Sequence, residues 1–130
     1  MVKFVLLSKS VPESRSNSVI DSPFAARCSV PIGLEDKRLH NGAMTASTYY
    51  NGYLAPWHGR INHRWSWSAR RNTRSQWLQV YFGGLARITG VMSQGRQDAN
   101  QWVKTFLLTF SRDGFSFAKY PKVWLRFKKE

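Results

Sequence analysis

Residues 75–120, SQWLQVYFGGLARITGVMSQGRQDANQWVKTFLLTFSRDGFSFAKY, decide the fold class of this chain. Three runs within it, 78–82, 87–94 and 103–111, carry the apolar residues of pleated strands, and the first and third alternate with a period of two. Asp113-Gly114 closes the third run as a turn, because glycine adopts a positive φ at little cost. The stretch therefore predicts strand after strand.

The segments around these runs are predicted to form loops. Residues 95–101 are polar and have no apolar periodicity, so we expect them to project from the sheet. Residues 44–47 are a short strand candidate and lead into an aromatic segment, 48–59, in which two glycines and a proline exclude a regular helix or central strand. Residues 60–74 contain five arginines without a regular period, which indicates a second, basic connection.

Composition bounds the architecture. The 130 residues suffice for one domain, and a hydrophobic share of 42% with an aromatic share of 15% excludes a disordered chain of low hydrophobicity. No apolar run is long enough to span a bilayer as a helix. Short strands, glycine-rich turns and the lack of an amphipathic helix together predict an all-β sandwich or barrel.

The two ends of the sequence differ in character. Residues 1–27 are rich in serine and contain two prolines, so we predict a flexible leader there and a folded domain over 28–130. A basic residue followed by the apolar residues 4–7 has the order of a signal peptide, but Ser8 and Lys9 end the apolar run early, and no signal peptide is predicted. The single cysteine, Cys28, has no partner within the chain for a disulfide.

Charge indicates the class of partner. Twenty Lys and Arg against seven Asp and Glu give a net charge of +13, which attracts nucleic acid, sulfated glycans or anionic lipid headgroups. Aromatic residues interleaved with arginines also suit base stacking with phosphate contact, so a basic nucleic-acid-binding β domain is the alternative function. A steep loss of binding with salt would favour that alternative.

The order of short motifs resembles the discoidin domain, the coagulation factor five/eight type C module. Seven matches carry the resemblance, in the family's order and at comparable spacing. They are Cys28 with PIGLE at 31–35, MTAS at 44–47, RIN at 60–62, QWLQVYFG at 76–83, TGV at 89–91 with QGR at 94–96, WVKT at 102–105, and SRDG at 111–114. Tyr81 departs from the pattern, because the family usually has aspartate there.

The resemblance implies a galactose-binding-like jelly-roll β-sandwich that acts as a non-enzymatic adhesion or recognition module, extracellular or at the cell surface. It covers about residues 28–120 and omits the family's carboxy-terminal strands, including the cysteine that normally pairs with the opening one. A truncated domain with its closing strands missing is therefore expected. The implied partners are a cell-surface glycan, an anionic phospholipid or an extracellular matrix protein, with peripheral membrane contact and no transmembrane segment.

In discoidin domains, loops at one end of the jelly roll carry ligand recognition, and segments 48–59 and 95–101 are similar to them by position. Tyrosine and tryptophan on a loop offer an apolar ring with a polar handle, which suits a lipid interface, a sugar or a peptide. Leu54 is expected to protrude, whereas Trp57 and one tyrosine could equally fold back onto the sheet. The predicted ligand-binding residues are Tyr49, Tyr50, Tyr53, Leu54, Trp57, Arg96 and Gln97.

Catalytic and metal-binding roles are not predicted. His58 and His63 lack the spacing of a zinc site, and no nucleophile motif or carboxylate pair occurs. Asp98 and Asn100 could contribute oxygen ligands to calcium, but two side chains are far from a complete shell, so a turn role is preferred and no cofactor is expected. The match at Arg60 predicts a structural arginine that packs beneath the loops.

Overall fold

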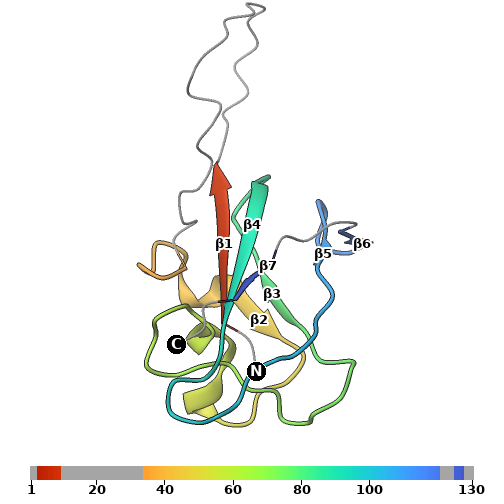
Figure 1. Ribbon diagram of the computed structural model, residues 1–130. Coiled ribbons are helices and arrows are strands. Elements are labelled where there is room, and N and C mark those ends of the chain that lie inside the picture. The colour runs from red at the N-terminus through yellow and green to blue at the C-terminus, as the bar shows by residue number, and fades with distance from the viewer. Residues whose placement is uncertain (1–2, 10–33, 121–124, 128–130) are drawn as a thin grey trace, which may run out of the picture.

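The computed structural model describes residues 3–9, 34–120 and 125–127, and its elements are strands and short 3-10 helices (Figure 1). Its longest sheet is built on β4 (Arg87–Gln94), which pairs antiparallel with β1 (Lys3–Lys9) and parallel with β7 (Leu125–Phe127). A register shift interrupts the pairing of β1 with β4 between Leu7 and Ser8. Strands far apart in the sequence thus meet on β4.

The described part of the chain also contains two smaller sheets. β2 (Met44–Ala46) pairs antiparallel with β3 (Leu78–Val80), and β5 (Thr109–Phe110) pairs antiparallel with β6 (Ala118–Lys119). Within the described ranges, the connections contain the 3-10 helices η2 (Asn41–Ala43), η3 (Gly52–Leu54) and η4 (Pro56–His58). No α-helix occurs in the ranges that the structure describes, in agreement with the predicted all-β class.

The core lies where β2, β3 and β4 approach one another. Leu34, Met44 and Val91 form its buried centre. The partly buried side chains packed against this centre are Leu39, Leu78, Val80, Phe82, Ile88 and Leu108. Leu78, Val80 and Phe82 are the residues that the alternation in 78–82 places on one face, so the predicted period of two is confirmed.

Two sequence predictions are wrong in part. Residues 3–9 fall in the predicted flexible leader but form β1, because an apolar, strand-prone run can pair along the whole of β4. Residues 10–33, which include Cys28 and the rest of that leader, lie outside the described ranges. The boundary between leader and domain stays a prediction.

The third predicted strand, 103–111, is limited to Thr109–Phe110. A strand needs a hydrogen-bonded neighbour, and in the described part of the chain this segment pairs only with β6 and with the adjoining Tyr120, whose N–H donates to Leu108 O (2.9 Å). Leu107 is exposed and Leu108 reaches the core, as the alternation of this run predicts. Strand predictions at 44–47, 78–82 and 87–94 are confirmed by β2, β3 and β4.

Candidate ligand-binding loops

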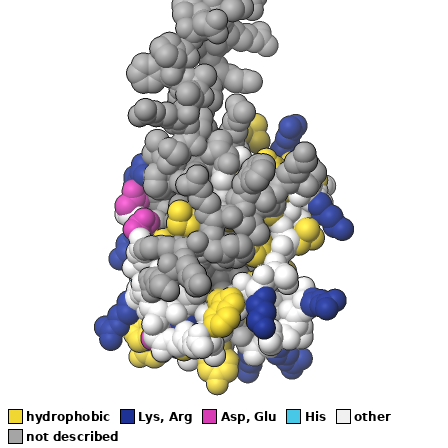
Figure 2. Space-filling model, in the orientation of Figure 1, with side chains coloured by type: hydrophobic (Ala, Val, Ile, Leu, Met, Phe, Trp, Pro, Cys, Tyr) yellow, Lys and Arg dark blue, Asp and Glu magenta, His cyan; other side chains and the backbone are white. Residues whose placement is uncertain are grey.

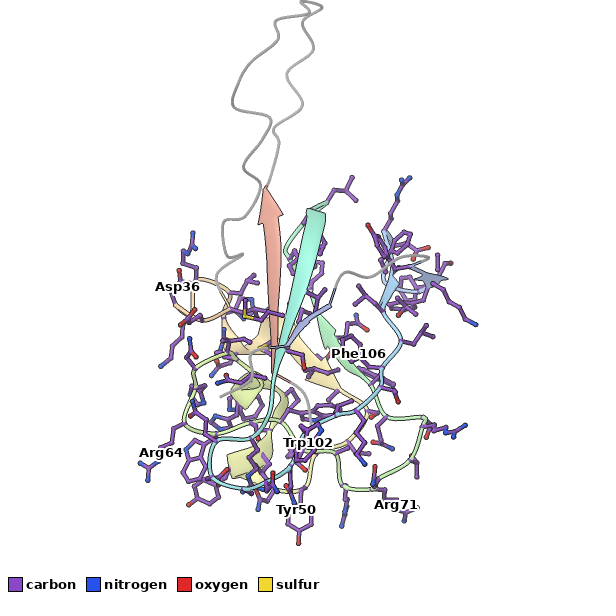
Figure 3. The ribbon with its side chains drawn as sticks, in the orientation of Figure 1. Asp36, Tyr50, Arg64, Arg71, Trp102 and Phe106 are labelled. Atoms are coloured by element: carbon purple, nitrogen blue, oxygen red, sulfur yellow. The ribbon has the colours of Figure 1, made fainter. Side chains whose placement is uncertain are left out.

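Segments 48–76 and 95–102 gather at one end of the molecule, which we call the loop end. Figure 3 shows Tyr50, Arg64, Arg71 and Trp102 together at this end, below the strands. Figure 2 shows hydrophobic and basic side chains side by side over the same region. The loops therefore combine apolar rings with positive charge on one surface.

A buried arginine holds the base of the loop end. Arg60 is 1% exposed, and its guanidinium donates to the backbone oxygen of Leu34 (2.6 Å), the backbone oxygen of Leu39 (2.8 Å) and the Oδ1 of Asn41 (3.0 Å). Burial lowers the pKa of Arg60 from its ordinary value, but an arginine begins so far above neutral pH that it stays charged. The predicted structural role of Arg60 is confirmed.

Backbone and side-chain hydrogen bonds join the aromatic segment to the basic one. Tyr50 N donates to Ser68 O (2.9 Å), and Ser68 N donates to Leu54 O (3.1 Å). The buried indole of Trp67 donates through Nε1 to the backbone oxygen of Thr48 (2.9 Å). These contacts span many residues of sequence, so they fix the path of the aromatic segment rather than only its local turns.

A third group of contacts ties both segments to β3. Ser47 Oγ and Thr48 Oγ1 both donate to Gln76 Oε1, immediately before the strand begins. Thr48 Oγ1 also accepts from the backbone N–H of Arg70 (3.1 Å). Thr48 thus contacts Trp67 and Arg70 within the basic segment and Gln76 just beyond its end, which explains why the second half of that irregular segment keeps a defined path.

Three tyrosines project from this frame. Tyr50 and Tyr53 are each 66% exposed, and Tyr49 is also exposed. The Tyr53 ring lies 5.4 Å from the half-buried Trp65, and the Tyr49 ring lies 6.4 Å from the half-buried Trp57. Tyr49 and Tyr53 therefore each pack against a tryptophan that limits their rotamers. A side chain restricted in this way loses less conformational entropy when it binds a ligand.

Leu54 does not protrude, which corrects the sequence prediction. It is 6% exposed, and the neighbouring Ala55 is fully buried. Asn51 caps η3 by accepting from Tyr53 N through its side chain (3.1 Å) and from Leu54 N through its backbone (3.0 Å). This tight turn points Tyr53 to solvent and Leu54 inward, so the loop end presents aromatic rings without an aliphatic tip.

Four arginines of the basic segment, Arg64, Arg70, Arg71 and Arg74, are exposed. Among the residues that the structure describes, no ion pair joins any of them to a carboxylate. The described acidic side chains are engaged elsewhere: Glu35 accepts from Asn62, Asp36 from Arg38, Asp98 from Arg96, and Asp113 from Ser111 and nearby amides. The Arg64 guanidinium lies 5.0 Å from the Trp65 ring centre. The positive charge of this end is therefore available to an anionic ligand.

The polar segment 95–101 forms the predicted loop, but its arginine is already paired. Arg96 forms a two-pronged ion pair with Asp98, which raises the pKa of Arg96. Its other terminal nitrogen donates to Gln101 Oε1 (3.2 Å), and its backbone N–H donates to Gln101 O (2.9 Å). Gln97 is exposed. The geometry thus assigns Arg96 to loop closure and leaves Gln97 facing solvent.

Two histidines lie together beside Trp57. The His58 and His63 ring centres are 5.0 Å apart, and His58 also contacts Trp57. The pKa of His58 is lowered, chiefly because burial disfavours the charged form and also because His63 and Arg60 repel a proton. Within the described ranges, no three of His, Cys, Asp and Glu gather as metal ligands.

Sequence reasoning omitted Trp102, which the fold adds to the loop end. It follows the polar loop directly and is about half exposed, and its Cβ lies close to Gly95. The motif match at 102–105 drew attention to Trp102 only as a scaffold residue. An aromatic residue next to a polar loop is the signal that could have identified it.

Comparison with known proteins gives one family. The family model described as F5/8 type C domain matches residues 43–127. Over 104 residues, 72% of this chain, it is 34% identical to lactadherin of Sus scrofa, 33% identical to coagulation factor VIII of Homo sapiens, and 30% identical to the human EGF-like repeat and discoidin I-like domain-containing protein 3. The matched region spans 25%, 4% and 22% of those proteins, respectively. No solved structure matches the fold of this chain.

Proposed function

The chain belongs to the F5/8 type C, or discoidin, domain family, and from this membership and the geometry of its loop end we propose that it is a non-enzymatic binding module for anionic phospholipid surfaces. The family resemblance read from the sequence is thereby confirmed, with its all-β sandwich class. The proposal places the module outside the cell or at its surface.

One observation carries the proposal: exposed tyrosines and unpaired arginines occupy the same end of the molecule (Figure 3). A tyrosine ring enters the headgroup region while its hydroxyl stays hydrated, and a guanidinium donates two hydrogen bonds to one phosphate. Tyr50 and Tyr53 supply the rings, and Arg70 and Arg71 supply the charge. The two classes of side chain are complementary, since the arginines favour an anionic surface over a neutral one and the rings favour a membrane interface over other polyanions.

The burial of Leu54 sets the depth of the contact. Without an aliphatic tip, the loop end would sit at the level of the headgroups and would not reach deep into the acyl chains. No helix in the described part of the chain is long and apolar enough to cross a bilayer. Peripheral attachment through the loops is the mode of membrane contact that we propose.

The test measures sedimentation of the full chain with vesicles of phosphatidylcholine, with and without phosphatidylserine. Tyr50→Ser with Tyr53→Ser should weaken retention by the anionic vesicles roughly tenfold, which corresponds to about 1.4 kcal/mol. Arg70→Gln with Arg71→Gln should cost about 1 kcal/mol per arginine near an anionic surface. The control is Tyr81→Ser, because Tyr81 is 63% exposed but lies at the end of β3 away from the loops, where its N–H donates to Ala43 O (2.8 Å).

Three results would overturn the lipid proposal. Equal retention by neutral vesicles would remove the role of the arginines, and a loss with Tyr81→Ser as large as that with the loop variants would remove the role of the loop end. Displacement from vesicles by duplex DNA at low salt, with DNA affinity that falls steeply as salt rises, would favour the nucleic-acid alternative.

A further inference from the structure

A second apolar surface lies on residues 107–120, which we call the hairpin because they contain β5, β6 and the turn between them. Five of its large apolar side chains are exposed: Leu107, Phe110, Phe115, Phe117 and Tyr120. Phe115 is 91% exposed, the largest value among the exposed large hydrophobic side chains described. Concentrated apolar exposure of this kind marks an interaction surface in a soluble domain.

The backbone of the hairpin offers strand edges. Thr109 pairs with Lys119 and Phe110 with Ala118, and in the described ranges no third strand joins this two-stranded sheet. Unpaired N–H and C=O groups along such an edge hydrogen-bond to an extended peptide that is added as a further strand. The side chain of Leu108 packs against the core and holds the hairpin to the domain.

The turn of the hairpin is ordered from within. Asp113 Oδ1 accepts from Ser111 Oγ (2.8 Å), Phe115 N (2.9 Å) and Ser116 N (2.8 Å). These hydrogen bonds lower the pKa of Asp113 far below its ordinary value, so the carboxylate stays ionised. Gly114 has φ +81°, which glycine alone adopts readily. The turn therefore does not depend on a partner for its shape.

An open pocket of about 290 Å³ adjoins this turn. Its lining residues are Phe110, Ser111, Arg112, Asp113, Ser116 and Ala118. Asp113 is held by hydroxyl and amide donors of the turn, and no ion pair joins Arg112 to a carboxylate among the residues described. Arg112 is thus free to receive a carboxylate that enters the pocket.

Charge decides between two occupants, a second copy of the chain and an acidic partner. Arg112 and Lys119 outnumber the one acidic side chain of the hairpin, Asp113, and the whole chain carries +13, so two copies that pair through their hairpins bring net positive charge together. An extended segment with alternating acidic and apolar residues instead meets basic side chains, exposed rings and an open edge at once. The surface is complementary to such a segment in charge, in apolar character and in backbone pairing.

We propose that the hairpin binds an extended, acidic and apolar segment of a protein partner by strand addition at the edge of the β5–β6 sheet, with a partner carboxylate in the pocket beside Arg112. Figure 1 shows this sheet at the side of the molecule away from the 3-10 helices of the loop end. The two surfaces are therefore separate, and a protein bound at the hairpin leaves the loop end open to a membrane.

The test titrates the full chain into a fluorescein-labelled seven-residue peptide that alternates glutamate with valine and phenylalanine, followed by fluorescence anisotropy. Arg112→Glu with Lys119→Glu should weaken binding about tenfold or more. The matched control, Arg70→Glu with Arg71→Glu, reverses the same charge at the loop end and should change the affinity by less than about twofold, because salt screens distant charges. Hydrogen exchange should show new protection of backbone amides in β5 or β6 when the peptide is bound.

Peptide composition provides the second arm. A peptide with lysine in place of glutamate, and one with proline at alternate positions, should both fail to bind, because the first reverses the charge and the second cannot donate to a strand edge. Phe115→Ser, at a position with no packing to lose, should weaken binding without changing the circular dichroism spectrum.

Equal binding of the lysine peptide, an equal loss with the loop-end control, or no binding of the glutamate peptide would each overturn the proposal. Sedimentation that shows a dimer abolished by Phe115→Ser would assign the surface to a second copy of the chain instead. Vesicle retention is measured in parallel on the same variants. Its loss with Arg112→Glu and Lys119→Glu would contradict the separation of the two surfaces.

Discussion

The loop end and the hairpin both expose aromatic rings, but they are held in different ways. At the loop end, Arg60, Trp67 and Gln76 form hydrogen bonds to residues about 19 to 29 positions away in the sequence. In the hairpin, the side-chain hydrogen bonds of Ser111 and Asp113 reach no further than three positions. The loop end is therefore part of the cooperative fold, whereas the hairpin is a local structure attached to it.

This difference indicates two modes of recognition. Rings fixed by long-range contacts are preorganised, so binding costs little additional ordering. A local hairpin with open edges can adjust to a partner, but it must lose more freedom when it binds. One substitution in each region, compared with a control substitution that should not alter stability, tests whether the two regions differ in stability as they differ in contacts.

The largest effect is expected from Arg60→Met. The change keeps much of the side-chain volume but leaves the buried oxygens of Leu34 and Leu39 without their donor, which should lower the free energy of unfolding by about 3 kcal/mol or more. Urea denaturation provides the measurement. Arg71→Met, at an exposed position, should stay within about 0.5 kcal/mol of the wild type. Similar losses for the two variants would contradict the anchoring role of Arg60.

A smaller effect is expected from Gly114→Ala in the hairpin turn. A side chain at φ +81° costs about 1 to 2 kcal/mol locally, so the turn should open more often. If the hairpin is a local unit, hydrogen exchange of the amides in 109–119 should accelerate while urea denaturation of the domain changes little. Gly84→Ala is the control, since an added Cβ there meets no atom within 4 Å and Gly84 has no positive φ. Equal destabilisation of the whole domain by Gly114→Ala would show that the hairpin belongs to the cooperative fold.

The smallest effect is expected from pH, because the side chain of His58 is only partly buried. Its pKa is lowered in the folded chain, so the unfolded chain takes up a proton at a higher pH, near 6.5. Stability present above about pH 6.5 should therefore decline as the pH falls toward the lower pKa of the folded state. His58→Gln should flatten this decline between pH 7 and pH 5 in thermal denaturation, and His40→Gln, at an exposed position, should retain it. If stability declined equally in His58→Gln, the decline would belong to titratable groups other than His58.

The sequence predicted which segment forms the site but not how each side chain points. The segment depends on local residues, whereas the direction of a side chain depends on contacts with residues elsewhere. The aromatic segment was identified because Gly52, Pro56 and Gly59 exclude regular structure locally. The direction of each side chain depends on partners elsewhere: Leu54 turns inward where Ser68 pairs with its backbone, and Arg96 is occupied by Asp98. Trp102 joins the loop end because the chain returns there, and its place beside the polar segment 95–101 is the one local sign of this in the sequence.

By itself, the sequence determined the all-β class, the family, the positions of β2, β3 and β4, and a strong positive charge, since these follow from alternation, short motifs and composition. Only the tertiary structure decided which rings face solvent, which arginines remain unpaired, and that residues 3–9 pair with β4. Periodicity reports the preference of a residue for burial, but burial itself depends on which distant segment arrives to cover it. The loop end is where that distinction bears most directly on function.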